Sequence, residues 1–127
     1  MTDFLSDVTS AALAKSLDAV GVRHRVLADN IANVETPGFR RSDVSFEEQL
    51  RAALGEGDSQ TAMRRVKATE PQVQLDEASP VGPNGNNVSI DKEMAELTKN
   101  DLRYQVLVQL LSLKGSMIKS AINEGKR

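Results

Sequence analysis

Two segments at opposite ends of the chain carry apolar residues in alternating steps of four and three. In residues 10–34 the line comprises Leu13, Leu17, Val20, Leu27, Ile31 and Val34, with His24 at its one position that is not aliphatic. In residues 90–122 it comprises Ile90, Met94, Leu97, Tyr104, Val108, Leu111, Ile118 and Ile122, with Asp101 and Gly115 as departures. Such steps place side chains along one line of an α-helix, as in a coiled-coil seam. We therefore predict two long helices.

The two predicted helices need each other as packing partners. Residues 10–34 would span about 40 Å as a helix, and residues 90–122 roughly 50 Å. Because the chain must return along itself to cover both seams, we expect an antiparallel hairpin. Only 3% of the residues are aromatic, which favours helix packing over a large globular centre. The predicted fold class is mainly α, a coiled-coil-like hairpin of N- and C-terminal helices in one domain, residues 1–127.

The first helix is predicted to end where turn-forming residues begin. These residues are Asn30, Asn33, Thr36, Pro37, Gly38 and Phe39. Asparagine tolerates left-handed backbone and can bond free carbonyls, so the helix should end near Asn33 or Val34. Pro37 and Gly38 fit the central positions of a type II turn, where glycine takes a positive φ without steric cost. Phe39 should pack on the helix end or on a neighbouring molecule.

After the turn, a short helix is predicted over residues 46–54. Ser45 and Glu48 have the spacing of a capping box. Phe46 and Leu50 are four residues apart, so they share one face that would dock on the long helices.

Residues 55–88 are expected to be irregular, because glycine and proline interrupt every periodic run. Met63, Val66, Val73 and Leu75 could support two short strands around Pro71, with disorder as the alternative. Ser89 is a candidate N-cap for the last helix. The chain thus divides into a helix, a turn with a short helix, an irregular segment and a second long helix, at residues 1–34, 35–54, 55–88 and 89–127.

The last helix carries more apolar surface than one partner helix can cover. Beside its seam lie Val106, Leu107, Leu110, Leu113 and Met117. On a thin hairpin this surface would stay exposed, and such surfaces mark contacts between subunits. We assign both seams and this added face to helix packing and to an interface with further subunits.

Little in the sequence supports chemistry at a site. A net charge of −2 argues against binding of a nucleic-acid backbone. With no cysteine and one histidine, we expect no metal site, cofactor or small-molecule substrate, and no enzyme activity. We interpret His24 as a partly buried ring bonded to a neighbouring chain or to water rather than as a pH sensor or ligand, and Asp101 as a seam residue that needs a partner.

Residues 30–39 resemble the N-terminal signature of the bacterial flagellar rod, hook and hook-associated proteins, in which Asn-aliphatic-Ala-Asn is followed by Thr-x-Gly-aromatic. Residues 42–50, 85–88 and 100–105 resemble the proximal-rod branch of this family. The likeness covers about residues 10–54 and 84–122. A helical adaptor or secretion chaperone is the alternative, since it would also show amphipathic helices and net acidity, but it would not need these motifs.

The resemblance implies a structural subunit of the flagellar basal-body rod, the shaft that transmits torque for motility. It implies self-assembly in a helical array, with other rod subunits and the membrane ring (MS ring) with its adaptor as partners, on the periplasmic side. Residues 1–10 lack a basic start, and no apolar run reaches the length of a signal peptide or membrane span. Export by the flagellar type III apparatus, without a cleavable signal peptide, is therefore expected.

Overall fold

The computed structural model describes residues 7–125. Residues 1–6, part of the segment used to argue against a signal peptide, and residues 126–127 lie outside the described part. Along the chain the helices and strands are α1 (Val8–Ala32), β1 (Ser42–Ser45), α2 (Glu47–Ala53), α3 (Ser59–Ala68), β2 (Gln72–Leu75) and α4 (Ile90–Glu124).

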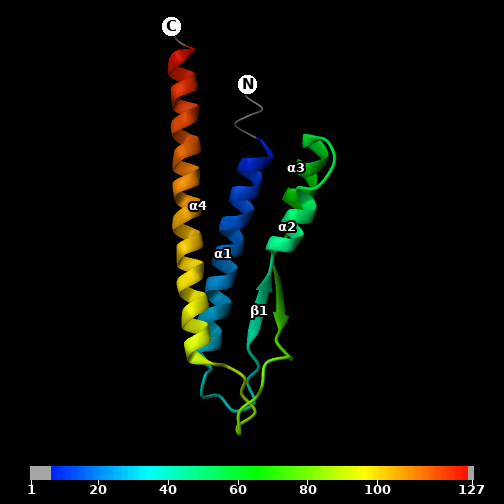
Figure 1. Cartoon of the computed structure of the whole chain (residues 1–127), viewed down its shortest axis with the longest axis vertical. Helices are drawn as coiled ribbons and strands as arrows, with labels where there is room; N and C mark the ends of the chain where they lie inside the picture. Colours follow the sequence, from blue (N-terminus) through cyan, green and yellow to red (C-terminus); the bar gives the residue numbers. More distant parts are fainter. Residues whose placement is uncertain (1–6, 126–127) are drawn as a thin grey trace.

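The long helices α1 and α4 lie side by side and run in opposite directions (Figure 1). The Asp7 side chain caps α1 by accepting from the Ser10 amide at 3.0 Å. Asn33 caps its other end, as predicted. α4, at 35 residues against 25, extends past the start of α1. The mainly α fold with long N- and C-terminal helices is thus confirmed.

The middle of the chain forms an arm, residues 42–75, that packs along α1 (Figure 1). Its base is a two-stranded antiparallel sheet in which Ser42 lies opposite Leu75, and its tip is formed by α2 and α3. The strand at Val73 and Leu75 was predicted correctly. The hairpin around Pro71 was wrong, because Met63 and Val66 lie in helix α3 and β2 pairs instead with β1.

The expectation of irregular structure across residues 55–88 was also wrong in part, because α3 lies within this segment. Asp58 caps α3 by accepting from the Thr61 amide at 2.7 Å. Ala62 and Val66, four residues apart, are buried, and α3 packs against α1. The apolar pattern of α3 is too short to predict a helix in a segment with so many glycines, and burial against α1 stabilises this helix.

The predicted capping box does not form. Ser45 ends strand β1, its hydroxyl exchanges hydrogen bonds with the Gln49 side chain at 2.8 and 3.0 Å, and Phe46 takes the N-cap position. Phe46 is 2% exposed. Phe46 and Leu50 border one hollow together with residues of α1 and α4. Docking of their shared face on the long helices stays a prediction.

The apolar core lies between α1 and the arm. Its buried members are Ala19, Val20, Leu27, Phe46, Ala53, Ala62 and Val66. Among residues 7–125, no aliphatic side chain of α4 is fully buried; the buried residues of this helix are Glu93 and Asn100. The apolar residues of α4 therefore stay largely exposed within one chain.

The orientation of α4 about its axis differs from the predicted seam. Leu97, Leu107, Leu111 and Ile118 are half-buried, whereas Met94, Tyr104, Val108 and Ile122 are exposed. On α1, Val20 and Leu27 are buried, and Leu13, Leu17 and Ile31 are half-buried. His24 and Asp101 are both exposed, so Asp101 is not the buried seam residue that was expected. Contact of His24 with a neighbouring chain or with water stays a prediction. Burial of Glu93 and Asn100 turns the predicted line partly away from α1.

Candidate functional site

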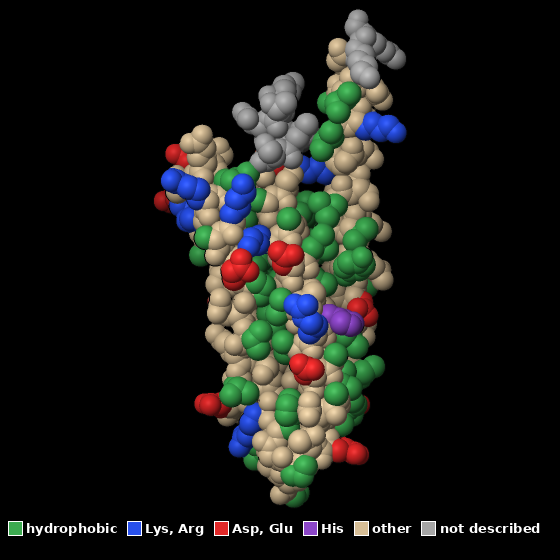
Figure 2. Space-filling model, turned by 180° about the vertical axis from the view of Figure 1, so that it is seen from behind, with side chains coloured by type: hydrophobic (Ala, Val, Ile, Leu, Met, Phe, Trp, Pro, Cys, Tyr) green, Lys and Arg blue, Asp and Glu red, His purple; other side chains and the backbone are tan. Residues whose placement is uncertain are grey.

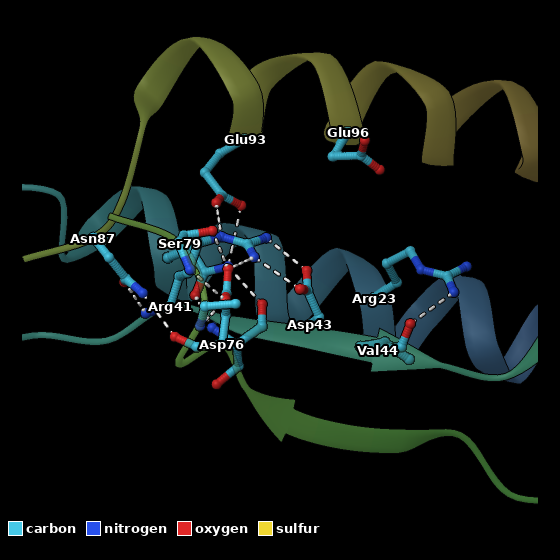
Figure 3. A network of polar contacts seen from close by, with 12 residues as sticks. Arg23, Arg41, Asp43, Val44, Asp76, Ser79, Asn87, Glu93 and Glu96 are labelled. Carbon is cyan, nitrogen blue, oxygen red and sulfur yellow. Dashed lines mark hydrogen bonds and ion pairs between the residues drawn. The ribbon is translucent and has the colours of Figure 1, made fainter. Parts of the chain in front are cut away.

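Buried and half-buried polar side chains gather where α1 ends and α4 begins (Figure 3). They come from α1, from the segment before β1, from the segment after β2, and from the first turn of α4. We call this cluster the polar joint, and its members are Asn30, Arg41, Asp76, Asn86, Asn87 and Glu93.

Glu93 lies at the centre of the polar joint and is 0% exposed. Its Oε2 accepts from the Asn30 side-chain amide at 3.1 Å, and its Oε1 accepts from the Arg41 Nε. A buried carboxylate is costly unless it is paired and hydrogen-bonded. Here both oxygens have donors, so the start of α4 is tied to α1 and to the base of the arm.

Arg41 joins three carboxylates. Its guanidinium donates to Asp43 at 2.7 and 2.8 Å and to Asp76 at 2.8 Å, in addition to Glu93. These bonds, that to Asp43 first, raise the pKa of Arg41 above its ordinary value. The Ser79 hydroxyl, and next the Arg41 guanidinium, hold the pKa of Asp76 well below its usual range. Arg41 and Asp76 are therefore both charged at neutral pH.

The Asn30 side chain acts as a hydrogen-bonding partner for the backbone of the arm. Its Oδ1 accepts from the Ser42 amide at 3.0 Å, and its Nδ2 donates to the Ser42 carbonyl at 2.9 Å. This is the two-way exchange that one strand residue makes with another. Asn30 thereby fixes where β1 starts relative to α1, and it is 1% exposed.

Asn86 holds the end of α1. Its Nδ2 donates to the carbonyl oxygens of Asn33 and Thr36, both at 2.8 Å, and its Oδ1 accepts from the Val88 amide at 2.7 Å. Carbonyls at a helix C-terminus lack partners within the helix. From the loop before α4, Asn86 provides hydrogen-bond donors to the carbonyls of Asn33 and Thr36, which lie 53 and 50 residues away in sequence.

Asn87 completes the connection between this loop and the arm. Its Oδ1 accepts from the Arg41 amide at 2.6 Å, and its Nδ2 donates to the Asp76 carbonyl at 2.7 Å. Its own amide donates to the Phe39 carbonyl at 3.3 Å. The loop is therefore bonded to both segments that flank the sheet.

The turn after α1 has the predicted geometry. The Phe39 amide donates to the Thr36 carbonyl at 3.2 Å, and Gly38 has a φ of 75°. Positive φ at the third residue of a four-residue turn is characteristic of type II. Gly85, in the loop before α4, lies close to this turn: a Cβ on Gly85 would lie 3.4 Å from the Gly38 Cα. Two loops cross here with little room for side chains.

The predicted assembly residues have different environments. Asn30 is buried in the polar joint, Asn33 and Phe39 are half-buried, and the last three, Thr36, Pro37 and Gly38, are exposed. Much of the motif's hydrogen-bonding capacity is therefore used within the chain. A role for its exposed part in contacts between subunits stays a prediction.

Sequence reasoning missed Arg41, Asp76, Asn86, Asn87 and Glu93. The doublet of asparagines after Gly85 was the available signal, since asparagine often bonds neighbouring backbone in loops. An acidic residue in the first turn of a helix is common because of the helix dipole, so the position of Glu93 in the sequence gives no sign of its burial. Nothing in the spacing brings Arg41 to it across 52 residues.

A second ion pair attaches the arm to α1 farther from the polar joint. Arg23 donates to the Glu47 carboxylate at 2.7 and 2.8 Å and to the Val44 carbonyl at 3.1 Å (Figure 3 labels Arg23 and Val44). Desolvation opposes ionisation of Glu47, but the hydrogen bonds and charge of Arg23 outweigh it, so the pKa of Glu47 lies below its usual value. The paired geometry sets the angle of α2 relative to α1.

Two hollows lie on the two sides of the α1–α4 pair. The arm-side hollow, about 500 Å³, is bounded by α1, by Phe46 and Leu50 of the arm, and by Leu102 and Val106 of α4. The outer hollow, about 310 Å³, is lined by Leu17, Val20, Gly21, His24, Asn100, Asp101 and Tyr104. Figure 2 shows hydrophobic side chains along α4 on the face that carries the histidine.

The exposed aliphatic residues of α4 continue beyond the arm-side hollow. They recur every three or four residues and so follow one side of the helix. We call this line the arm-side flank, and it consists of Leu102, Val106, Leu110, Leu113 and Met117, all exposed.

Neither metal chemistry nor a membrane span is indicated in the described part of the chain. Residues 7–125 contain no group of three or more His, Cys, Asp or Glu side chains that could hold a metal ion. No helix in this range is long and apolar enough to cross a membrane.

Comparison with known proteins identifies the family. No protein-family model matches the chain. The flagellar basal body rod protein FlgB of Borreliella burgdorferi is 33% identical over 108 residues, covering 74% of this chain and 80% of that protein. The FlgB proteins of Bacillus subtilis and Escherichia coli are 30% and 31% identical, covering 90% and 87% of this chain and 92% and 94% of the relatives. The chain belongs to the FlgB family.

The resemblance drawn from residues 30–39 and the later motifs is thereby confirmed. In this FlgB-family chain, residues 30–39 form the end of α1 and the turn that Asn86 and Gly85 hold. The signature segment, residues 30–39, thus coincides with the part of the fold where α1, the arm and α4 are joined.

Proposed function

We propose that the chain is a structural subunit of the flagellar basal-body rod, and that it assembles with other subunits into the shaft that transmits torque for motility. The observation that carries the proposal is its likeness, over most of both chains, to proteins named flagellar basal body rod protein. The function is mechanical, and we propose no catalysed reaction.

The exposed apolar surface of α4 supports assembly. Leu102, Val106, Leu110, Leu113 and Met117 are exposed on one side of the helix, and Tyr104, Val108 and Ile122 on another. Exposed apolar surface of this extent is unfavourable for an isolated chain and is typical of subunit interfaces. Covering both sides of α4 would require neighbours on both sides, as in a helical array.

The polar joint supports torque transmission. A shaft needs subunits that do not change shape under load, and here hydrogen-bonded charges fix α1, the arm and α4 relative to one another. Buried polar networks whose members are satisfied confer rigidity and a unique arrangement. The joint would keep the exposed flanks at a constant angle in each subunit.

We further propose that the partners are other rod subunits and the MS ring with its adaptor, and that the assembled chain lies on the periplasmic side. The chain would reach this place through the flagellar export apparatus, without a cleavable signal peptide. These inferences rest on the family resemblance and on no contact within the chain.

Complementation with isolation of basal bodies tests the proposal. A strain whose own copy of the gene is deleted is supplied with the tagged chain, and swimming and the composition of purified basal bodies are measured. Restored swimming with the tag in the basal-body fraction is the expected result. An unrelated helical protein with the same tag is the control. Absence of the chain from basal bodies of swimming cells would overturn the proposal.

A further inference from the structure

The two hollows beside α1 and α4 differ in shape and charge. The arm-side hollow is bordered by exposed aliphatic residues, and its charged lining residues are the positive Arg23, Lys99 and Arg103 and the negative Glu47. The outer hollow contains a glycine and is bordered by Asp101 and Tyr104. One side of the pair therefore presents large apolar side chains beside positive charge, and the other presents a recess beside negative charge.

Gly21 makes the outer hollow accessible to a large side chain. It lies in the middle of α1 and is exposed, and an added Cβ there would meet, within 4 Å, no described atom beyond its chain neighbours and the nearby backbone of α1. Glycine inside a helix is unfavourable relative to alanine. Its benefit is that another chain can approach the helix backbone closely.

Asn100 adds a second, independent observation at this hollow. The residue is 1% exposed and lines the recess. Its Nδ2 donates to the Val20 carbonyl at 3.0 Å, but its Oδ1 accepts no hydrogen bond from the described residues. Buried acceptors are normally satisfied. The outer hollow thus combines open space with the Asn100 Oδ1, a buried acceptor that has no hydrogen-bond donor among the described residues.

The charges on the two sides are complementary. Asp101 is exposed and makes no ion pair with any residue in 7–125. Arg103 is exposed on the arm side of the same helix. Two residues apart on a helix, these side chains point in different directions and do not face each other. The positive charge of Arg103 also helps to lower the pKa of Glu47 in its own chain. Neither Asp101 nor Arg103 forms an ion pair within residues 7–125, so each can face the other residue type on a second molecule.

We propose that a second copy of this chain docks its arm-side flank, at Leu102, Val106 and Leu110, on the outer hollow at Gly21 and Tyr104. In this contact Arg103 of one copy faces Asp101 of the other. The inference rests on the proposed rod function and names the partner of the exposed flanks. Because the two surfaces are different patches, repeating the contact generates an open helical array rather than a closed pair.

Disulfide cross-linking tests the contact without background, since the chain has no cysteine. Two singly substituted chains with different tags, His24→Cys in the outer hollow and Val106→Cys on the arm-side flank, are co-expressed in the deletion strain. After mild oxidation of purified basal bodies, we expect a dimer that carries both tags. Replacing His24→Cys by Lys67→Cys, on exposed α3, should yield about tenfold less of this dimer.

Charge reversal provides a second test. Asp101→Arg and Arg103→Asp should each lower the amount of the chain in basal bodies about tenfold, because like charges would meet across the contact. The double variant should restore it, since the pair is reversed but still opposite. Circular dichroism of the purified variants checks that the helices are retained.

The outcomes separate this inference from the proposed function. A chain that is present in basal bodies but forms no dimer carrying both tags, or only an adduct with another rod protein, overturns docking between copies and leaves the rod function standing. Failure of the double variant to recover also overturns the docking. Absence of the unmodified tagged chain from basal bodies overturns the rod function and this inference together.

Discussion

Asn30 and Glu93 meet inside the protein, where the Asn30 Nδ2 donates to the Glu93 Oε2 at 3.1 Å across a separation of 63 residues. Asn30 lies in the last turns of α1 and Glu93 in the first turn of α4. The contact sets the position of the two long helices relative to each other, and the Arg41 guanidinium on the same carboxylate adds the arm to this arrangement.

Removal of the Glu93 carboxylate should destabilise the fold. In Glu93→Ala, Arg41 and Asn30 lose a buried acceptor, so we expect the free energy of unfolding in urea to fall by about 3 kcal/mol. Glu96→Ala, one turn later and 41% exposed at its side chain, should change it by less than about 0.5 kcal/mol. Equal effects of the two substitutions would contradict a special role for the polar joint.

Substitution of asparagine by aspartate hardly changes the volume of the side chain, but it should lower the unfolding free energy more at Asn86 than at Asn84. Asn86→Asp replaces two donated hydrogen bonds with a carboxylate facing the carbonyls of Asn33 and Thr36, and should cost about 2–3 kcal/mol of unfolding free energy. Asn84→Asp is the control, because the Asn84 side chain uses its oxygen, as acceptor from the Asn86 amide. The prediction fails if chemical denaturation shows the same midpoint for both.

Gly38 should resist substitution because of its backbone. With a φ of 75°, Gly38→Val should cost about 1–3 kcal/mol. Gly21→Ala, where the added methyl group meets open space in a helix, should raise the stability of the isolated chain by about 1 kcal/mol. Thermal unfolding followed by circular dichroism measures both. A neutral Gly38→Val would show that the turn can adopt another conformation at no cost.

Acid should weaken the attachment of the arm. The pKa values of Asp76 and Glu47 are lowered in the folded chain, so each contributes stability that is present above its unfolded pKa of about 4 and is lost as pH falls through the folded value. Stability should therefore decline below about pH 5. Asp76→Asn should flatten this decline, measured as urea midpoints between about pH 6 and pH 3. An unchanged slope would mean that Asp76 does not contribute.

Charges on the arm-side flank should act on assembly and not on folding. Leu110 and Met117 are 43% and 47% exposed, so Leu110→Asp and Met117→Asp should change the free energy of unfolding by less than about 0.5 kcal/mol. Burial of an unpaired carboxylate between subunits costs several kcal/mol, so swimming should be lost. Gln109→Asp, at an exposed polar position of the same helix, is the matched control. Normal swimming of both flank variants would show that the flank faces solvent in the rod.

The sequence alone determined the elements whose signals are local or strongly periodic. Steps of four and three predict the long helices, because side chains three and four residues apart share a face. Pro37 and Gly38 predict the type II turn, because only glycine takes positive φ without cost. The exposed aliphatic residues beside the α4 seam could be anticipated, since one partner helix cannot cover so wide a face.

Only the tertiary structure decided how these elements meet. Ser45 has the spacing of a capping residue, but strand pairing with Gln72 places it in β1. α3 forms because α1 buries Ala62 and Val66, and Glu93 and Asn100 turn α4 about its axis so that Tyr104 and Val108 face outward. Contacts between residues far apart in sequence have no periodic signature, because the chain between them can take many paths. The sequence thus predicts which helix faces are apolar, and packing at the polar joint determines which of these faces stay exposed for contact with other subunits.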